Sequence, residues 1–373
     1  MKKPKIRFKG YQEDWEQRKL SELGQIMTGS TPSTSKSEYY SEDGIPWVTP
    51  TDIEATTILD TPRKLSEEGA KVGRVVPANT ILCTCIASIG KNTLLMVKGS
   101  FNQQINSLTP YEENDAYFLL TESELWSNKM KRMAASGTMQ IVNKTEFSEL
   151  QTMVPKSAEQ KQIGSYFRNL DHLITLHQRK CEETKTLKKY MLQKMFPQNG
   201  HSVPEIRFSG FTEDWEQRKL DDVVEFLDTM RKPLEGAKRI SGPYPYYGAS
   251  GIVDYVDGYL FDEELILLSE DGANITDRNY PVCFIASGKY WVNNHAHVLR
   301  SKKGNENNFI CNSLERKDYT QYNTGMAMPK LNKETCRKIP VLCPTFEEQQ
   351  KIGDCFRSLD HLITLHDGVK FFL

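Results

Sequence analysis

The chain has 373 residues, enough for about two to three domains with their own cores. Its hydrophobic content of 38% and charged content of 26% are ordinary for a globular protein, and no apolar run or secretory signal predicts a membrane or export route, so a cytoplasmic protein is expected. The formal net charge of −1 argues against a protein that holds nucleic acid by bulk positive charge alone.

The most informative feature is a repeat. Residues 5–20 return at 205–220 with 12 of 16 positions identical, and residues 159–177 return at 348–366 with 14 of 19 identical. We call these four segments the repeated frame. Between them the two halves barely match. Similar frames around divergent interiors favour two different binding modules over a duplicated enzyme.

Segment 1–157 is rich in Gly, Pro, Thr and short β-branched runs, which predicts short strands, loops and few helices. Helices are expected at WEQRKLSEL, 15–23, and at 114–134. Trp15 and its repeat Trp215 are expected to pack in a core rather than bind a ligand.

Segment 158–196 predicts one long helix, roughly 58 Å at ~1.5 Å per residue, because it has no proline and its seam positions recur in steps of four and three. A helix of this length favours pairing with a partner helix over lying on its own domain. The seam consists of Ile163, Phe167, Leu170, Ile174, His177, Cys181, Thr184, Lys188, Met191 and Met195.

Segment 197–345 predicts a linker and a second strand-rich domain, and 346–373 restarts the long helix, whose likeness to the first copy stops after His366. The second helix therefore reads as truncated. The fold class expected is α+β, with two domains joined by long helices that pair as an antiparallel coiled coil. The pairing is expected to join Ile163, Phe167, Leu170 and Ile174 to Ile352, Phe356, Leu359 and Ile363, leaving Leu187, Met191 and Met195 exposed.

No catalytic motif accompanies these domains. The sequence lacks a GxxxxGK[ST] phosphate loop and the GxSxG and HExxH motifs. The eight cysteines contain no CxxC pair, which predicts reduced thiols rather than structural zinc. His295-Ala296-His297 has no third metal ligand nearby, and Ser269-Glu270-Asp271-Gly272 reads as a loop that satisfies its own backbone, so structural roles are favoured for both. The chain is expected to catalyse nothing by itself.

The two frames resemble the specificity subunit of type I restriction-modification systems. The likeness rests on WEQRKL at the entry of each half and on the EQ-x-x-IG start of each long helix. It also rests on interior segments typical of target recognition domains, namely 29–53, 101–108, 244–255, 266–275 and 292–300.

The resemblance implies two target recognition domains, 1–157 and 197–345, and helices 158–196 and 346–373 that act as a ruler between them. Each domain would read one half of a bipartite, asymmetric site in double-stranded DNA. The expected partners are two modification (methyltransferase) subunits, which methylate adenine, and two restriction (ATP-dependent translocase and nuclease) subunits. S-adenosylmethionine, ATP and Mg²⁺ would be used by those partners, and no cofactor, metal or membrane is expected for this chain.

Base readout needs side chains with paired donors and acceptors, supported by phosphate contacts. The candidates are Thr31, Ser33, Lys36, Gln103, Gln104, Thr138 and Gln140 in the first domain, and Arg231, Lys232, Arg239, Tyr247, Ser250, Asn274, Lys330 and Asn332 in the second. For each of them a solvated loop residue is the alternative.

Two other functions remain open. The chain could be a protein-binding scaffold without DNA specificity, or a defective or regulatory specificity subunit with a truncated helix. A DNA reader, once combined with its methyltransferase partner, should bind one split sequence with a steep salt dependence, whereas a scaffold should not.

Overall fold

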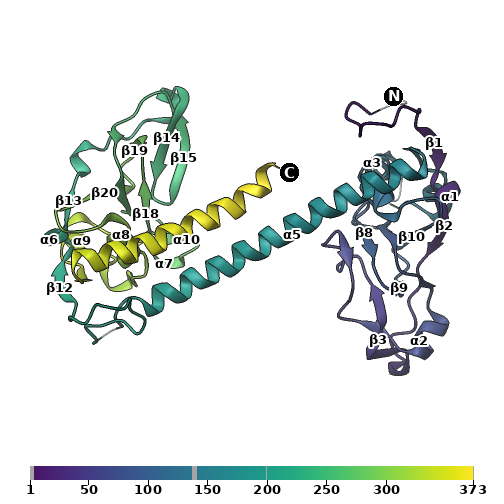
Figure 1. Cartoon of the computed structure of the whole chain (residues 1–373), viewed down its shortest axis with the longest axis horizontal. Helices are drawn as coiled ribbons and strands as arrows, with labels where there is room; N and C mark the ends of the chain where they lie inside the picture. The colour runs from purple at the N-terminus through teal and green to yellow at the C-terminus, as the bar shows by residue number, and fades with distance from the viewer. Residues whose placement is uncertain (1–3, 137–140, 199, 373) are drawn as a thin grey trace. The chain divides into compact units, whose positions relative to one another are not determined.

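The computed structural model describes residues 4–136, 141–198 and 200–372 (Figure 1). The chain forms two compact units, residues 1–175 and 176–373. The division falls within the long helix α5 (Ser157–Lys194), so this helix begins in the first unit and ends in the second. Within the described ranges, no helix is both long and apolar enough to pass through a bilayer.

The first unit is a strand-rich domain followed by the start of α5. Its other elements are β1 (Glu16–Lys19), α1 (Leu20–Leu23), β2 (Gly24–Thr28), β3 (Tyr40–Val48), β4 (Thr57–Ile58), β5 (Lys64–Leu65), α2 (Glu67–Val72), β6 (Val75–Val76), β7 (Thr80–Thr84), β8 (Asn92–Leu95), β9 (Gly99–Phe101), β10 (Ile105–Pro110), α3 (Ala116–Ser136), α4 (Lys144–Glu149) and β11 (Gln151–Val154). Two sheets have the orders β2-β10-β7-β8-β4 and β5-β3-β9-β6, and β1 pairs with β11. The larger core lies between the first sheet and α3 and includes Leu108, Phe118 and Trp126.

The second unit repeats this plan. Its elements are β12 (Glu216–Lys219), α6 (Leu220–Val223), β13 (Val224–Phe226), β14 (Ser241–Gly248), β15 (Gly251–Val256), β16 (Phe261–Asp262), β17 (Leu265–Ser269), α7 (Asn274–Asp277), β18 (Cys283–Ala286), β19 (Lys289–Val292), β20 (Ala296–Ser301), α8 (Asn307–Glu315), α9 (Lys333–Arg337), β21 (Pro340–Cys343) and α10 (Phe346–Phe372). The sheets have the orders β13-β20-β17-β18 and β15-β14-β19-β16, and β12 pairs with β21.

The two interiors share one topology although their sequences barely match. The order β13-β20-β17-β18 corresponds to β2-β10-β7-β8, and β14 pairs in parallel with β19 as β3 does with β9. Buried side chains can differ between the two interiors while the strand pairing stays the same, because many combinations of apolar side chains fill a core of the same volume. The predicted α+β fold with two strand-rich domains is confirmed.

The expectation for the repeated entry segment is partly wrong. Only Leu20–Leu23 and Leu220–Val223 are helical, and the preceding EQRK residues form β1 and β12. Each of these strands pairs antiparallel with the strand that leaves its domain, β11 or β21. Tertiary pairing thus overrides the helix propensity of Glu, Gln, Arg and Lys. The helix expected over 114–134 is confirmed as α3.

The predicted antiparallel pairing of the two long helices is confirmed within the second unit. Nδ1 of His177 lies 2.9 Å from Nδ1 of His366, and Nζ of Lys188 lies 2.6 Å from a carboxylate oxygen of Asp360. In Figure 1, α10 (yellow) accordingly lies beside the second half of α5 (teal). The helix continues to Phe372, although its likeness to the first copy ends at His366.

The predicted register of this pairing is wrong. Ile352, Phe356 and Leu359 are buried in the core of the second unit. Met191 of α5 packs against this core, Met195 and Phe196 directly after α5 are part of it, and Cys181 contacts the backbone oxygen of Ile363. The second unit therefore uses the half of α5 that follows Ile174, not Ile163, Phe167, Leu170 and Ile174.

The predicted exposure of the end of α5 is correct for only one of three residues. Leu187 is 48% exposed, but Met195 is 2% exposed and Met191 is packed against the core. Met191 and Met195 pack with the core of the second unit, whereas Leu187, one helical turn before Met191, is not part of that core. The repeated phenylalanines also differ, since Phe356 is fully buried and Phe167 is 38% exposed.

Candidate nucleic-acid interface

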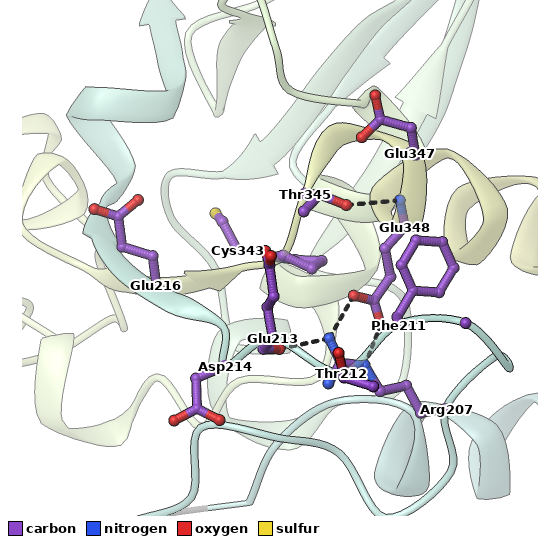
Figure 2. Close-up of a pocket in the computed structure, with 12 residues that line it drawn as sticks. Arg207, Phe211, Thr212, Glu213, Asp214, Glu216, Cys343, Thr345, Glu347 and Glu348 are labelled. Atoms are coloured by element: carbon purple, nitrogen blue, oxygen red, sulfur yellow. Dashed lines mark hydrogen bonds and ion pairs between the residues drawn. The ribbon is translucent and has the colours of Figure 1, made fainter.

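The repeated frame is held together in each unit by the same ion pair. The guanidinium of Arg7 donates to both carboxylate oxygens of Glu159 at 2.6 and 2.7 Å, and that of Arg207 donates to Glu348 at 2.8 Å twice. Figure 2 shows Arg207 between Glu348 and the backbone oxygen of Glu213. The pair joins the entry segment to the first turn of the long helix, which explains why both segments repeat together.

The Gln of each EQ motif makes the next connection. Gln160 accepts from the backbone N–H of Asp115 and donates to the carbonyl of Pro155, while Gln349 accepts from Glu306 N–H and donates to Pro344. Asp115 and Glu306 in turn accept from backbone N–H groups in the first turns of α3 and α8. The frame therefore sets the position of the helix that covers the sheet in each domain.

The Gly of the same motif is required by this packing. A Cβ at Gly164 would overlap the carboxylate of Asp115, and one at Gly353 would overlap that of Glu306. Both glycines lie inside a helix, where alanine is ordinarily preferred by about 1 kcal/mol. Their presence is thus explained by close approach and not by backbone conformation.

We predict that Gly353→Ala destabilises the protein by about 1 kcal/mol, because the Cβ would displace the Glu306 carboxylate from the Phe309 N–H that it caps and from Arg357, and this loss exceeds the gain in helix propensity. The matched control is Gly368→Ala in the same helix. A Cβ at Gly368 meets nothing within 4 Å, so this variant should gain about 0.5–1 kcal/mol. Urea unfolding of both variants measures the difference, and equal stabilisation by both would contradict the proposed overlap.

The groove beside the frame is acidic. In the second unit it is lined by Glu213, Asp214, Glu216, Glu347 and Glu348, together with Arg207 (Figure 2). Such a surface repels phosphate groups. The loops at the ends of the strands are therefore better candidates for a nucleic-acid interface than this groove.

Four loop segments of the first unit meet where β2, β7 and β10 adjoin. Thr31, after β2, donates to the side chain of Gln103 in the β9–β10 turn. In the same turn Gln104 accepts at its carbonyl from Cys85 N–H, after β7, at 2.8 Å. Ile86 forms a bridge with Ile141, which brings the segment before α4 to the same place.

The second unit brings the corresponding segments together with different side chains. Arg231, which follows β13 as Thr31 follows β2, lies beside the β19–β20 turn. Glu270 N–H donates to the carbonyl of His295 as Cys85 does to Gln104. The backbone of Asp271 forms a β-bridge with that of Lys330, as the backbone of Ile86 does with that of Ile141. The two domains thus place their loops at corresponding positions on the same strand topology.

One pair beneath these loops differs in kind. In the first unit Thr28 donates to Asn106 at 2.7 Å, a neutral hydrogen bond. In the second unit the corresponding residues are Asp228 and His297, with Nδ1 of His297 at 2.8 Å from the carboxylate. Nε2 of His297 contacts the carbonyl of Leu331 at 2.8 Å, so both ring nitrogens face acceptors and the imidazolium form is favoured.

The pKa of His297 reflects this arrangement. Burial is the largest single influence and lowers the pKa of the imidazole, but the interactions with Asp228 and Cys336 together outweigh it and raise the pKa to about 10. For Asp228, burial raises the pKa and the hydrogen bond from His297 lowers it, with the net effect below the ordinary value. The structural role favoured for His297 is confirmed by its burial and its two partners.

The structure brings some of the first-domain candidates together. Thr31 and Gln103 are in contact, and Gln104 is held by Asn102 in the same turn. Ser33 and Lys36 are exposed on the loop after β2, where Lys36 lies over the ring of Tyr39. Thr138 and Gln140 lie outside the described residues.

Several second-domain candidates are engaged inside the protein. Arg231 donates to Glu270 and to the carbonyl of Ala296, both at 2.7 Å, and Glu270 also pairs with Lys330 at 3.5 Å. Asn274 is 9% exposed and bonds to the backbone of Tyr280. Arg231 and Lys330 therefore meet through one carboxylate, while Asn274 shapes its own loop.

The remaining second-domain candidates are spread more widely. Asn332 caps α9, and the ring of Tyr247 packs on Phe284 and Tyr290. Arg239 donates to Asp254 at 3.2 Å and covers the ring of Tyr246. Lys232 and Ser250 are exposed. DNA contact by any of the candidates stays a prediction.

Asp228, Asp271 and His295 were not among the predicted site residues. For His295 the sequence does contain a signal. Segments 101–108 and 292–299 share a pattern in which an Asn is followed by two polar residues and then by a strand, and His295 is the second of these polar residues. In the described part of the chain, no three His, Cys, Asp or Glu side chains come together as metal ligands. Trp15 and Trp215 pack on Phe118 and Phe309, as expected.

Comparisons with known proteins agree with the duplicated plan. The family described as type I restriction modification DNA specificity domain matches residues 12–186 and 212–370. The EcoprrI specificity subunit of Escherichia coli is 24% identical over 370 residues, covering 94% of this chain and 90% of the relative, and the HindI specificity subunit of Haemophilus influenzae is 32% identical over 163 residues, covering 41% and 35%. The crystal structure of a type I restriction-modification system S subunit from M. genitalium is similar in fold, with a TM-score of 0.71 at 15% identity over 99% of this chain and 96% of that one.

Proposed function

The chain belongs to the type I restriction modification DNA specificity family, whose members are non-catalytic subunits, and from this premise we propose that each of its units reads one half of a bipartite, asymmetric site in double-stranded DNA. The bases are contacted by the loops that follow β2 and β13, by the β9–β10 and β19–β20 turns, and by the segments before α4 and α9.

One observation carries this proposal. The two units keep the same loop positions on the same strand topology, yet the side chains at corresponding positions differ, as Thr31 and Gln104 do from Arg231 and His295. A shared scaffold with exchanged polar side chains suits two modules that meet the same kind of surface but different base pairs. It therefore predicts two unlike half-sites.

The long helices and the frame serve the partners in this proposal. Two modification subunits, which use S-adenosylmethionine, and two restriction subunits, which use ATP and Mg²⁺, assemble on the specificity subunit. Members of the family supply no catalytic group of their own, so the role of this chain is to position the partner subunits on the DNA. The unread gap between the half-sites follows the length of α5.

The test is a map of methylated adenine across the genome of cells that express this chain with its cognate modification subunit. We expect a single motif with two unlike halves and a fixed gap. Cells expressing the modification subunit alone are the control. No motif, or a palindromic one, would count against the proposal and would favour a protein-binding scaffold.

A second variant tests the ruler. We predict that inserting seven residues between Thr175 and Leu176 lengthens the gap by about three base pairs, because two helical turns add ~10.5 Å and base pairs are ~3.4 Å apart. Two full turns also return the helix nearly to its original phase. The same motif halves at the old spacing would show that α5 does not set the gap.

A further inference from the structure

The turns between β9 and β10 and between β19 and β20 are built alike. The side-chain oxygen of Asn102 accepts from Gln104 N–H at 3.0 Å, and that of Asn293 accepts from His295 N–H at 2.8 Å. The carbonyls of Gln104 and His295 accept from the residues that follow β7 and β17. At both positions the backbone is therefore anchored on the N–H side and on the carbonyl side.

The next residue in each chain segment fixes the position further. Ile105 and Ala296 are fully buried at the start of β10 and β20. The side chains at 104 and 295 are thus the last ones before the core begins, on a backbone that has little freedom. A rigidly held polar side chain is better suited to base discrimination than one on a mobile loop.

His295 is both exposed and oriented. Its side chain is 50% exposed, and Nδ1 lies 2.8 and 3.0 Å from the two carboxylate oxygens of Asp271. Asp271 is itself fixed by its backbone bridge to Lys330. A carboxylate selects the tautomer with hydrogen on Nδ1, which leaves the lone pair on Nε2. Among the described residues, Nε2 makes no hydrogen bond.

A purely structural role explains this residue less well. Structural histidines are enclosed, as His297 is at 1% exposed with both nitrogens bonded. His295 has one nitrogen held by the protein and the other left to the solvent side. In this arrangement the carboxylate of Asp271 fixes the orientation of the imidazole, and Nε2 remains available to bind a ligand.

We infer that His295, oriented by Asp271, reads one base pair of the half-site bound by the second unit. Nε2 accepts a hydrogen bond from the exocyclic amino group of adenine or cytosine in the major groove. Asp271 is a positioning residue, because it acts only through the imidazole. The inference rests on the proposed function and adds a specificity-determining residue to it.

The experiment compares maps of methylated adenine for the full chain and for His295→Ala, His295→Gln and Asp271→Asn, each with the modification subunit. We expect His295→Ala to relax one position of one half-site by about tenfold, with the other half and the gap unchanged. Asp271→Asn should relax the same position. Gln104→Ala is the matched variant and should affect only the other half-site.

The outcomes separate the two ideas. If the unchanged chain gives no bipartite motif, the proposed function fails. If it gives one and His295→Ala leaves every position as it was, or weakens all sites evenly as loss of a phosphate contact would, the inference is overturned. Equal methylation of a synthetic duplex in which the affected adenine or cytosine lacks its exocyclic amino group would overturn the acceptor role. Thermal unfolding within about 2 °C of the unchanged chain confirms that His295→Gln is folded.

Discussion

Replacing Arg207 with methionine is expected to destabilise the second unit by about 2–4 kcal/mol, because the substitution leaves the carboxylate of Glu348 buried without its partner. Glu348 is 1% exposed and accepts both of its charged hydrogen bonds from Arg207. The expected loss lies below that of a fully enclosed pair, since the guanidinium keeps 14% exposure. Urea unfolding of the full chain, followed by tryptophan fluorescence near Trp215, measures it.

The control is the double variant Arg207→Met with Glu348→Leu. Replacing both partners removes the uncompensated charge, so most of the lost stability should return. The corresponding change in the first unit, Arg7→Met, should act in the same direction, because Arg7 pairs with Glu159 in the same geometry. A single variant that unfolds no more easily than the double variant would contradict this account.

The second large effect concerns His297 and pH. Its pKa of about 10 in the folded chain lies above the ~6.5 expected when unfolded. The stabilisation is therefore complete below about pH 6.5 and declines as pH rises toward 10. His297→Gln, which leaves Asp228 without its imidazolium, should lose about 3 kcal/mol at pH 6 and less at pH 10.

The first unit supplies the control for this prediction. Its corresponding pair, Thr28 and Asn106, is neutral. The double variant Asp228→Thr with His297→Asn copies it and should lose the part of the stability decline between pH 7 and 10 that His297 causes. A series of unfolding midpoints over that range checks the sign, and a dependence as steep as in the unchanged chain would locate the titrating group elsewhere.

Much of the architecture could be predicted from the sequence because the frame carries its own contacts. Both members of each pair, Arg7 with Glu159 and Arg207 with Glu348, lie inside repeated segments, and the heptad-like seam marks α5 without any tertiary information. The register of α10 could not be predicted. It depends on how Met195 and Phe196 fill the space beside Phe356, and the seam spacing alone fits several registers.

The details of the candidate interface were less predictable. A sequence identifies polar loop residues but not their partners, so Arg231 gave no sign that Glu270 and a carbonyl would hold it. The amide of Asn274 suits base contact by its chemistry, but in the structure it bonds to the backbone of Tyr280 in its own loop. The common topology of the interiors was hidden as well, because strand pairing survives changes of side chain that erase sequence similarity.

The pairing of β1 with β11, and of β12 with β21, has a consequence for the history of such chains. Each interior begins and ends on adjacent strands, so its two ends lie only one strand spacing apart, about 4.8 Å. An unrelated interior of the same topology can therefore be exchanged by recombination within the repeated DNA that encodes the frame. The exchange would leave the frame's Arg–Glu pair and its helix intact, and under the proposed function it would give a new recognition sequence in a single genetic step.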